Sequence, residues 1–171
     1  MRISQNFGIL YTLLVICQIV MSNYTHLGPY IMLTMLPAMT LCIPTGISTV
    51  MCMLIAFASG LAVDWLSEGF LGLNAASLTA VALIRKGVIR FFLGEDIIIR
   101  NDSFSIRKNG LTKVSLALIT VTAVFLAIYI ILDGAGTRPT WFNLAKFGAS
   151  IGCNWLLGLL VVTILIPDDR K

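Results

Sequence analysis

The chain has 171 residues, of which 58% are hydrophobic and 12% are charged, and its mean hydropathy is +0.94. A soluble domain of this length could not bury so much apolar surface in one core, so the composition indicates a membrane protein. The net charge of +4 does not indicate nucleic-acid binding, because nearly all charged residues lie between or beside the apolar runs.

Six apolar runs follow one another along the chain. A helix rises about 1.5 Å per residue and the hydrocarbon core of a bilayer is about 30 Å thick, so about 20 residues can cross it. The pattern predicts an all-α membrane protein with six transmembrane helices in one polytopic domain, residues 1–171. Pro37 is expected to break the second run, and a very short turn at residues 44–46 separates it from the third. The predicted spans are 7–24, 29–43, 45–66, 70–92, 114–132 and 141–166.

The first run follows Arg2 and is short, which is also typical of a secretory signal peptide. No small-x-small cleavage site occurs in the next residues, SNYTHLG, and five further runs follow. We therefore expect an uncleaved first helix.

Basic residues are distributed unevenly between the two sides of such a bundle. With the N-terminus inside, ten of the twelve Lys and Arg residues fall on the inner side, and only Arg138 and Lys146 fall toward the outer side. The asymmetry predicts that both termini face the cytoplasm. The inner residues are Arg2, Arg85, Lys86, Arg90, Arg100, Arg107, Lys108, Lys113, Arg170 and Lys171. Aromatic residues expected at the outer interface are Tyr24, Tyr30, Trp65 and Trp141.

Catalytic and cofactor-binding signatures are weak in this sequence. It contains no P-loop, no G-x-G-x-x-G and no H-E-x-x-H pattern. Four cysteines, Cys17, Cys42, Cys52 and Cys153, lie in or beside apolar runs without C-x-x-C spacing, and His26 has no second ligand near it. We predict a protein that is not an enzyme, with no catalytic residue, cofactor or metal site.

The sixth run carries a row of polar residues inside an apolar segment. Lys146, Ser150 and Asn154 recur every fourth position and so share one helix face, with Asn143 one turn before. Polar groups are costly in hydrocarbon unless they are paired or wetted. The favoured interpretation is hydrogen bonding to neighbouring helices, with Lys146 extending toward water. The alternative is a ligand pocket that opens outward.

Small residues line one face of the third run. They recur every fourth position and end at an acid: Cys52, Ala56, Gly60 and Asp64. Such a groove lets another helix backbone approach closely, and close packing drives helix association in lipid. Gly148 and Gly152 repeat the arrangement in the sixth run as a G-x-x-x-G. The partner helix could belong to this chain or to another.

Residues 60–76, GLAVDWLSEGFLGLNAA, join the third and fourth runs and contain two acids, Asp64 and Glu68. The acids lie at a helix end with no histidine or second buried acid beside them, so they lack the surroundings of a catalytic pair. We expect a turn in which Asp64 and Ser67 hydrogen-bond freed backbone groups and the glycines relax the chain.

The polar segment from about 85 to 113 is the long cytoplasmic loop of this arrangement. Its first part, RKGVIRFFLGE, has the pattern of a helix leaving the membrane with its basic residues at the headgroup level. The remainder is expected to be a solvated connector held at the surface by basic residues. Lying on the membrane or docking a cytoplasmic partner are the alternatives.

The stretch 60–76 resembles the signature of the rod shape-determining protein MreD family. In that family a glycine-containing membrane helix ends at an Asp, turns through Ser and Gly, and enters the next helix through Leu-Gly and small residues. The matching residues are Gly60, Asp64, Ser67, Gly69, Leu71, Gly72, Ala75 and Ala76. Asn74 and Glu68 depart from the typical pattern. The length, the spans and the basic loop are similar as well.

The resemblance implies a small multi-pass protein of the bacterial cytoplasmic (inner) membrane, with a bundle like the six-helix S components of energy-coupling-factor vitamin transporters. It implies an MreC-like partner within the elongation machinery that links MreB filaments to a RodA-type glycosyltransferase and its transpeptidase. Membrane lipid is an expected partner, and nucleic acid is not.

The leading hypothesis is a non-enzymatic scaffold that supports cell shape and lateral peptidoglycan synthesis, and the alternative is a substrate-binding S component. An S component is expected to have a substantial first outer loop and a small-residue face on its first helix. This chain has the short loop SNYTHLGP and only Gly8 and Thr12 at such spacing, which favours the scaffold. The candidate packing or partner interface comprises Cys52, Ala56, Gly60, Asp64, Ser67, Gly69, Gly72, Asn74, Gly148 and Gly152, and the candidate outward polar row Lys146, Ser150 and Asn154.

Overall fold

The computed structural model describes residues 5–24, 31–68, 70–95, 97, 104, 109–134 and 139–166. Across these residues the chain forms six α-helices, one π-helical turn and no strands, which confirms the all-α prediction. The elements are α1 (Gln5–Tyr24), α2 (Leu36–Cys42), α3 (Thr49–Val63), η1 (Asp64–Glu68), α4 (Leu73–Leu93), α7 (Leu111–Gly134) and α8 (Thr140–Leu165).

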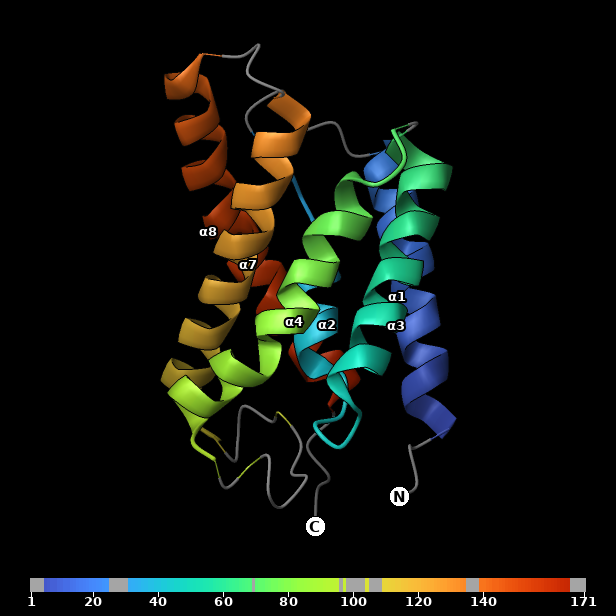
Figure 1. Cartoon of the computed structure of the whole chain (residues 1–171), viewed down its shortest axis with the longest axis vertical. Coiled ribbons are helices and arrows are strands. Elements are labelled where there is room, and N and C mark those ends of the chain that lie inside the picture. The colour runs from blue at the N-terminus through green and yellow to red at the C-terminus, as the bar shows by residue number, and fades with distance from the viewer. Residues whose placement is uncertain are drawn as a thin grey trace.

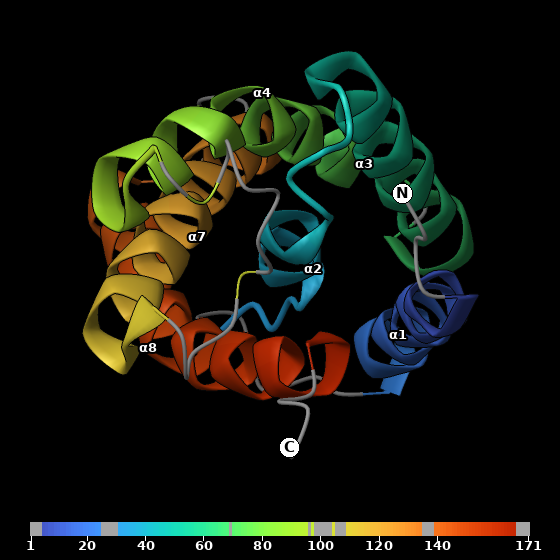
Figure 2. The same ribbon diagram turned by 90° about the horizontal axis from the view of Figure 1, so that it is seen from below.

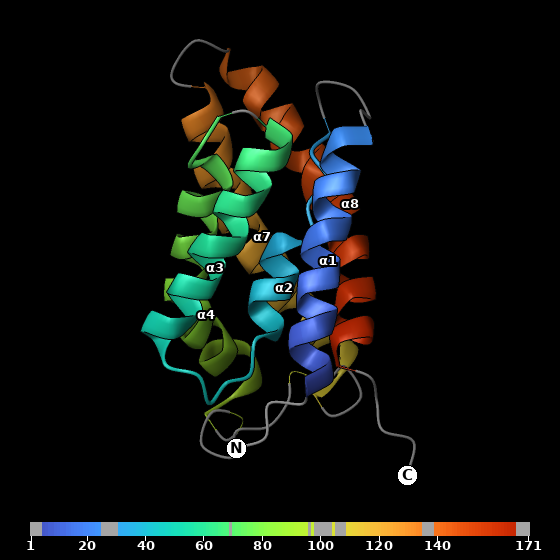
Figure 3. The same ribbon diagram turned by 90° about the vertical axis from the view of Figure 1, so that its right-hand side faces the viewer.

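The five long helices form a ring around the short helix α2 (Figure 2). Around the ring, α3 contacts α4, α4 contacts α7, α7 contacts α8, and α1 closes the circle between α8 and α3 (Figure 2 and Figure 3). The central helix α2 contacts all five of them. Successive helices run in opposite directions along the bundle, so α1 begins and α8 ends at the same end (Figure 1).

Four helical segments are long and apolar enough to cross a membrane: Phe7–Tyr24, Thr49–Ser67, Leu111–Gly134 and Thr140–Leu165. They support the prediction of a membrane protein. The outward side of α1 carries a row of exposed apolar side chains, Ile9, Leu13, Ile16 and Val20, at the spacing of one helix face. Such a stripe suits contact with lipid chains.

The second predicted span, 29–43, is wrong as a single helix broken at Pro37. Residues 31–35 are not helical, and α2 has only seven residues. Pro37 lies in the first turn of α2, where a missing N–H removes no helical hydrogen bond and the fixed φ favours the helix. The proline therefore starts a helix in place of breaking one. All seven residues of α2 are buried.

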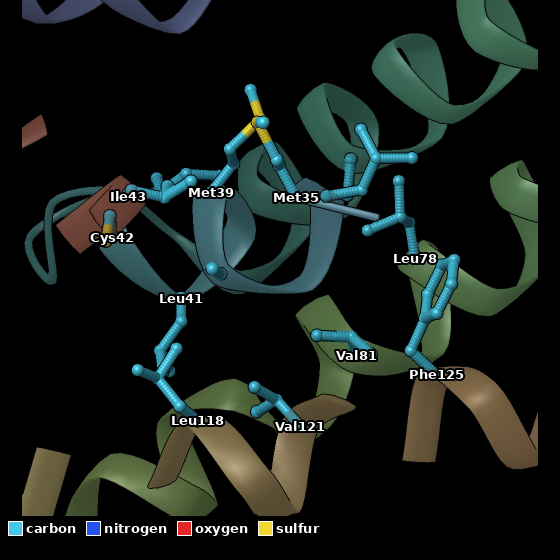
Figure 4. Packing of buried hydrophobic residues seen from close by; sticks show 14 of the residues in the cluster. Met35, Met39, Leu41, Cys42, Ile43, Leu78, Val81, Leu118, Val121 and Phe125 are labelled. Carbon is cyan, nitrogen blue, oxygen red and sulfur yellow. The ribbon is translucent and has the colours of Figure 1, made fainter. Parts of the chain in front are cut away.

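The hydrophobic core surrounds α2. Figure 4 shows Leu41 of α2 pointing toward Leu118 and Val121 of α7, and all three side chains are fully buried. Helix α8 comes close to the same region at Gly158, where a Cβ would lie 3.2 Å from Leu118 Cδ2 and 3.4 Å from Ala38 Cβ. A short central helix can be enclosed in this way because small residues let the outer helices approach it.

The other helices begin and end within a few residues of the predicted positions. The third span begins at Thr49 because the Ser48 Oγ accepts a hydrogen bond from Met51 N at 3.3 Å and caps the helix. Helix α4 begins at Leu73, three residues later than predicted, and α7 begins at Leu111, three residues earlier.

Within the predicted loop 85–113, α4 continues to Leu93, as the predicted span 70–92 and the pattern of a helix leaving the membrane indicate, and α7 starts at Leu111. The prediction that this loop is a solvated connector is wrong at Ile97 and Phe104, whose side chains are buried and belong to the hydrophobic core. Predicted loop and terminal residues outside the described ones are Arg2, His26, Tyr30, Arg100, Arg107, Lys108, Arg138, Arg170 and Lys171.

Candidate functional site

The groove predicted on α3 is filled by α4 of the same chain. Cys52, Ala56 and Gly60 are all buried on that face. A Cβ on Gly60 would lie 2.6 Å from Ala75 Cα, 2.7 Å from Ala75 N and 2.9 Å from Asn74 C. Real side chains do not approach backbone atoms so closely, so only glycine admits the α4 backbone here. A helix of another protein has no room at this position.

Asp64 is wholly buried at the end of α3, and its carboxylate accepts four hydrogen bonds from the start of α4. Oδ2 accepts from Gly72 N at 2.9 Å and from Ala75 N at 3.1 Å. Oδ1 accepts from Asn74 N at 3.0 Å and from Asn74 Nδ2 at 2.9 Å. The first N–H groups of a helix lack helical partners, and negative charge is favourable there. Asp64 therefore caps α4 from the preceding helix.

The turn between the two helices is compact. Ser67 Oγ donates to the Val63 carbonyl at 2.6 Å, and Gly72 has a φ of +106°, a conformation that other residues rarely adopt. These contacts agree with the turn predicted from the sequence. Gly69 and the side chain of Glu68 lie outside the described part of the chain.

Asn74 departs from the signature that residues 60–76 resemble, and the structure gives it a local role. Its side chain is 1% exposed and donates to Asp64 through Nδ2. Its Oδ1 is buried and has no hydrogen-bond partner in the part of the chain that the structure describes. Asn74 thus belongs to the cap of α4 and faces the bundle interior.

The polar row of α8 holds the non-helical segment that precedes α2. Ser150 Oγ accepts from Met32 N at 3.0 Å. Asn154 Oδ1 accepts from Thr34 N at 2.8 Å, and Asn154 Nδ2 donates to the Met32 carbonyl at 3.0 Å. Non-helical backbone inside a membrane protein needs such partners, because no water is available in hydrocarbon.

Gln18 of α1 holds the other edge of the same segment, although it was not among the predicted site residues. Its Oε1 accepts from Met35 N at 2.7 Å, and its Nε2 donates to the Leu33 carbonyl at 3.3 Å. In non-helical chain, alternate residues direct their backbone groups to opposite sides. Gln18 therefore hydrogen-bonds the backbone of residues 33 and 35, whereas Asn154 hydrogen-bonds the backbone of residues 32 and 34. A glutamine in the middle of the apolar first span was the signal that could have identified it.

Lys146 lies inside the bundle, so the prediction that it extends toward water is wrong. Its side chain is 11% exposed, its Nζ lies 3.2 Å from Asp133 Oδ2, and Nζ lies 5.7 Å from the centroid of the Tyr129 ring. The ion pair and the ring compensate for removing the ammonium from water. All three members of the predicted row thus bind other parts of the chain, which agrees with the first interpretation for Ser150 and Asn154 but not for the position of Lys146.

Residues 148–152, GASIG, match the G-x-S-x-G spacing of serine hydrolases. In those enzymes the serine lies on a sharp turn between a strand and a helix. Here Ser150 lies in the middle of α8, fully buried, and its Oγ binds the backbone of Met32. The arrangement does not form a nucleophile.

Gly148 and Gly152 lie on the exposed side of α8. A Cβ at either position would meet no atom of the described residues within 4 Å. The two glycines therefore have no packing role among the described residues, in contrast to Gly60.

Arg85 is buried, although the sequence placed it at the headgroup level. Its side chain is 1% exposed, and its Nε donates to the Leu41 carbonyl at 3.2 Å, at the end of α2. Nη1 lies 4.0 Å from Cys52 Sγ, and Nη2 has no hydrogen-bond partner among the described residues. A cation is favourable at a helix C-terminus, which explains its position beside α2. In the sequence, Arg85 stands at the end of an apolar run, and this pattern does not show that its side chain points into the bundle.

The described residues contain no group of three or more His, Cys, Asp or Glu side chains that could hold a metal ion. The four cysteines are free, with Cys42 and Cys52 buried and Cys17 exposed. Comparison of the chain with known protein families, with curated proteins and with solved structures finds no match.

Proposed function

We propose that this protein is a non-enzymatic membrane scaffold of the bacterial cell-elongation machinery, which binds an MreC-like partner. The supporting observation is the hairpin at residues 60–76, the stretch that resembles the MreD signature. Gly60 admits the α4 backbone, Asp64 caps α4 and Gly72 takes a positive φ. Each of these three matched residues is thus needed for the local backbone geometry of the hairpin. Residues of this kind are expected in the signature of a family whose members share one fold.

The proposal includes six membrane crossings with both termini in the cytoplasm. Residues 31–42 are too few for a helical span, yet the five non-helical residues and the seven residues of α2 extend about 27 Å together, at about 3.3 and 1.5 Å per residue. This matches the hydrocarbon thickness of about 30 Å. The distribution of basic residues supports the orientation.

The face proposed for the partner is the exposed side of α8 around Gly148 and Gly152. Neither glycine is contacted closely by another described residue, and a G-x-x-x-G on an exposed membrane helix permits close approach by another helix. The groove on α3 is unsuitable, since α4 occupies it.

The test is co-purification in mild detergent with the MreC-like protein of the same genome. Gly152→Leu should reduce the amount of MreC-like protein recovered at least fivefold, because a leucine would hold a facing helix away. Gly8→Leu is the matched control, since Gly8 is also exposed with nothing within 4 Å of a Cβ. Equal recovery with both variants would reject the α8 face, and no MreC-like protein with the parent chain would reject the scaffold.

The alternative function is an S component, and the buried pair of Lys146 with Asp133 is the observation that favours it. A charged pair inside a membrane bundle often marks a ligand path. The same purification separates the two functions. A bound vitamin and a transport motor, lost with Gly8→Leu and retained with Gly152→Leu, would establish the S component.

A further inference from the structure

The turn between α3 and α4 exposes apolar side chains to an unusual degree. Trp65 is 76% exposed, Leu66 59%, Phe70 75% and Leu71 67%. The end of α1 lies beside them, because Asn23 Nδ2 donates to the Leu66 carbonyl at 3.2 Å. We call residues 65, 66, 70 and 71 the α3–α4 tip.

Among the described side chains of this turn, no charged group is exposed beside them; the side chain of Glu68 is not among the described ones. Among the described side chains of residues 64–73, the charged one is Asp64, which is fully buried. The other end of α4 differs, since Arg90 and Glu95 form an ion pair at 3.0 Å with both side chains 64% exposed. One end of the same helix therefore presents charge to its surroundings and the other presents rings and leucines.

Next to the tip, three N–H groups at the start of α4 have an acceptor within the chain. The N–H groups of Gly72, Asn74 and Ala75, which water would normally hydrate at a helix start, all bind the Asp64 carboxylate. An internal acceptor is needed where a helix start lies in an environment poor in water.

The tip also continues an apolar stripe. Along α3 the exposed residues Leu54, Phe57 and Leu61 follow one helix face, and Trp65 takes the next position on it. If this stripe faces lipid chains, the tip lies at their boundary with the headgroups. Tryptophan is enriched at that depth.

From these observations we infer that the α3–α4 tip is a membrane anchor inserted into the lipid interface, with the glycerol and upper acyl region as its binding partner. The inference is independent of the proposed function, because it needs only a protein embedded in a bilayer. It assigns the buried Asp64 a purpose: the carboxylate replaces the water that the tip excludes.

The test uses Trp65 as a depth probe. The chain has three tryptophans, so the variant Trp141→Phe/Trp155→Phe leaves Trp65 alone. The protein is reconstituted into phosphatidylcholine vesicles that contain lipids spin-labelled at the headgroup, at a shallow acyl carbon or at a deep acyl carbon. We expect quenching by the shallow labels at least twofold stronger than by the deep label, and weak quenching by aqueous iodide.

Two results would overturn the inference. Strong iodide quenching with little quenching by any labelled lipid would place the tip in water or against a protein. Strongest quenching by the deepest label would place it in the hydrocarbon core. The variant Trp65→Phe/Trp141→Phe, which keeps Trp155 in the middle of α8, provides the deep reference. If the first variant is unstable, the difference in emission between the parent chain and Trp65→Phe gives the same depth.

Discussion

Two regions of this bundle contain backbone groups that have no hydrogen-bond partner within a helix and lie in apolar surroundings. Different kinds of side chain bind these groups in the two regions. At the start of α4, the Asp64 carboxylate accepts three backbone hydrogen bonds from residues 8 to 11 positions away. Before α2, two amides, Gln18 and Asn154, bind opposite edges of residues 32–35 from 15 to 122 positions away.

The difference follows from what each region must satisfy. A helix start has only unpaired donors, so an anion can serve several at once and also benefits from the helix dipole. A non-helical segment has unpaired donors and acceptors in alternation, so an amide, which carries both, is the suitable side chain. The first solution is local and therefore visible in one stretch of sequence, whereas the second joins three distant segments.

The largest effect is expected from Gly60→Leu. Backbone atoms of α4 lie within 3 Å of the position of its Cβ, and backbone cannot move aside as a flexible side chain can. We expect the free energy of unfolding, measured by SDS titration in mixed micelles, to fall by more than about 3 kcal/mol. The control is Gly148→Leu, which adds the same side chain where nothing lies within 4 Å. Similar stability of the two variants would show that the α3–α4 contact is not tight.

Asp64→Ala should have the next largest effect, about 3 kcal/mol, since it leaves three backbone N–H groups, two buried and one partly buried, without this acceptor. Asp64→Asn keeps one carbonyl oxygen and should lose less. The same SDS titration measures both. An unchanged Asp64→Ala would mean that water reaches the start of α4, which would also contradict the interfacial position of the tip.

We expect Gln18 and Asn154 each to contribute less to the free energy of unfolding than Asp64 does. Asn154→Leu and Gln18→Leu each remove one donor and one acceptor, and we expect a loss of about 2 kcal/mol for each. Because both hold one segment, the double variant should lose less than the sum of the single ones. Strict additivity would show that the two edges are held independently. Thr163→Val removes a hydroxyl bound within its own exposed helix face and serves as the control.

Much of the architecture could be predicted because it depends on local patterns. The apolar runs predicted where the four long apolar helices lie, and small residues every fourth position predicted the groove on α3. The acid and glycines between the third and fourth runs predicted a hydrogen-bonded turn. Each of these signals lies within one element or between adjacent ones, and spacing along a helix fixes which residues share a face.

Other features depended on contacts between distant parts of the chain. Whether the groove on α3 served this chain or another was settled only when α4 was found in it. The sequence could not show that Pro37 begins a seven-residue helix, that Arg85 turns inward to the end of α2, or that Lys146 pairs with Asp133. The sequence by itself determined an all-helical, strongly apolar chain with a capped turn at its centre. Only the tertiary structure decided which polar groups meet, because in an apolar surrounding each must find its partner across the bundle.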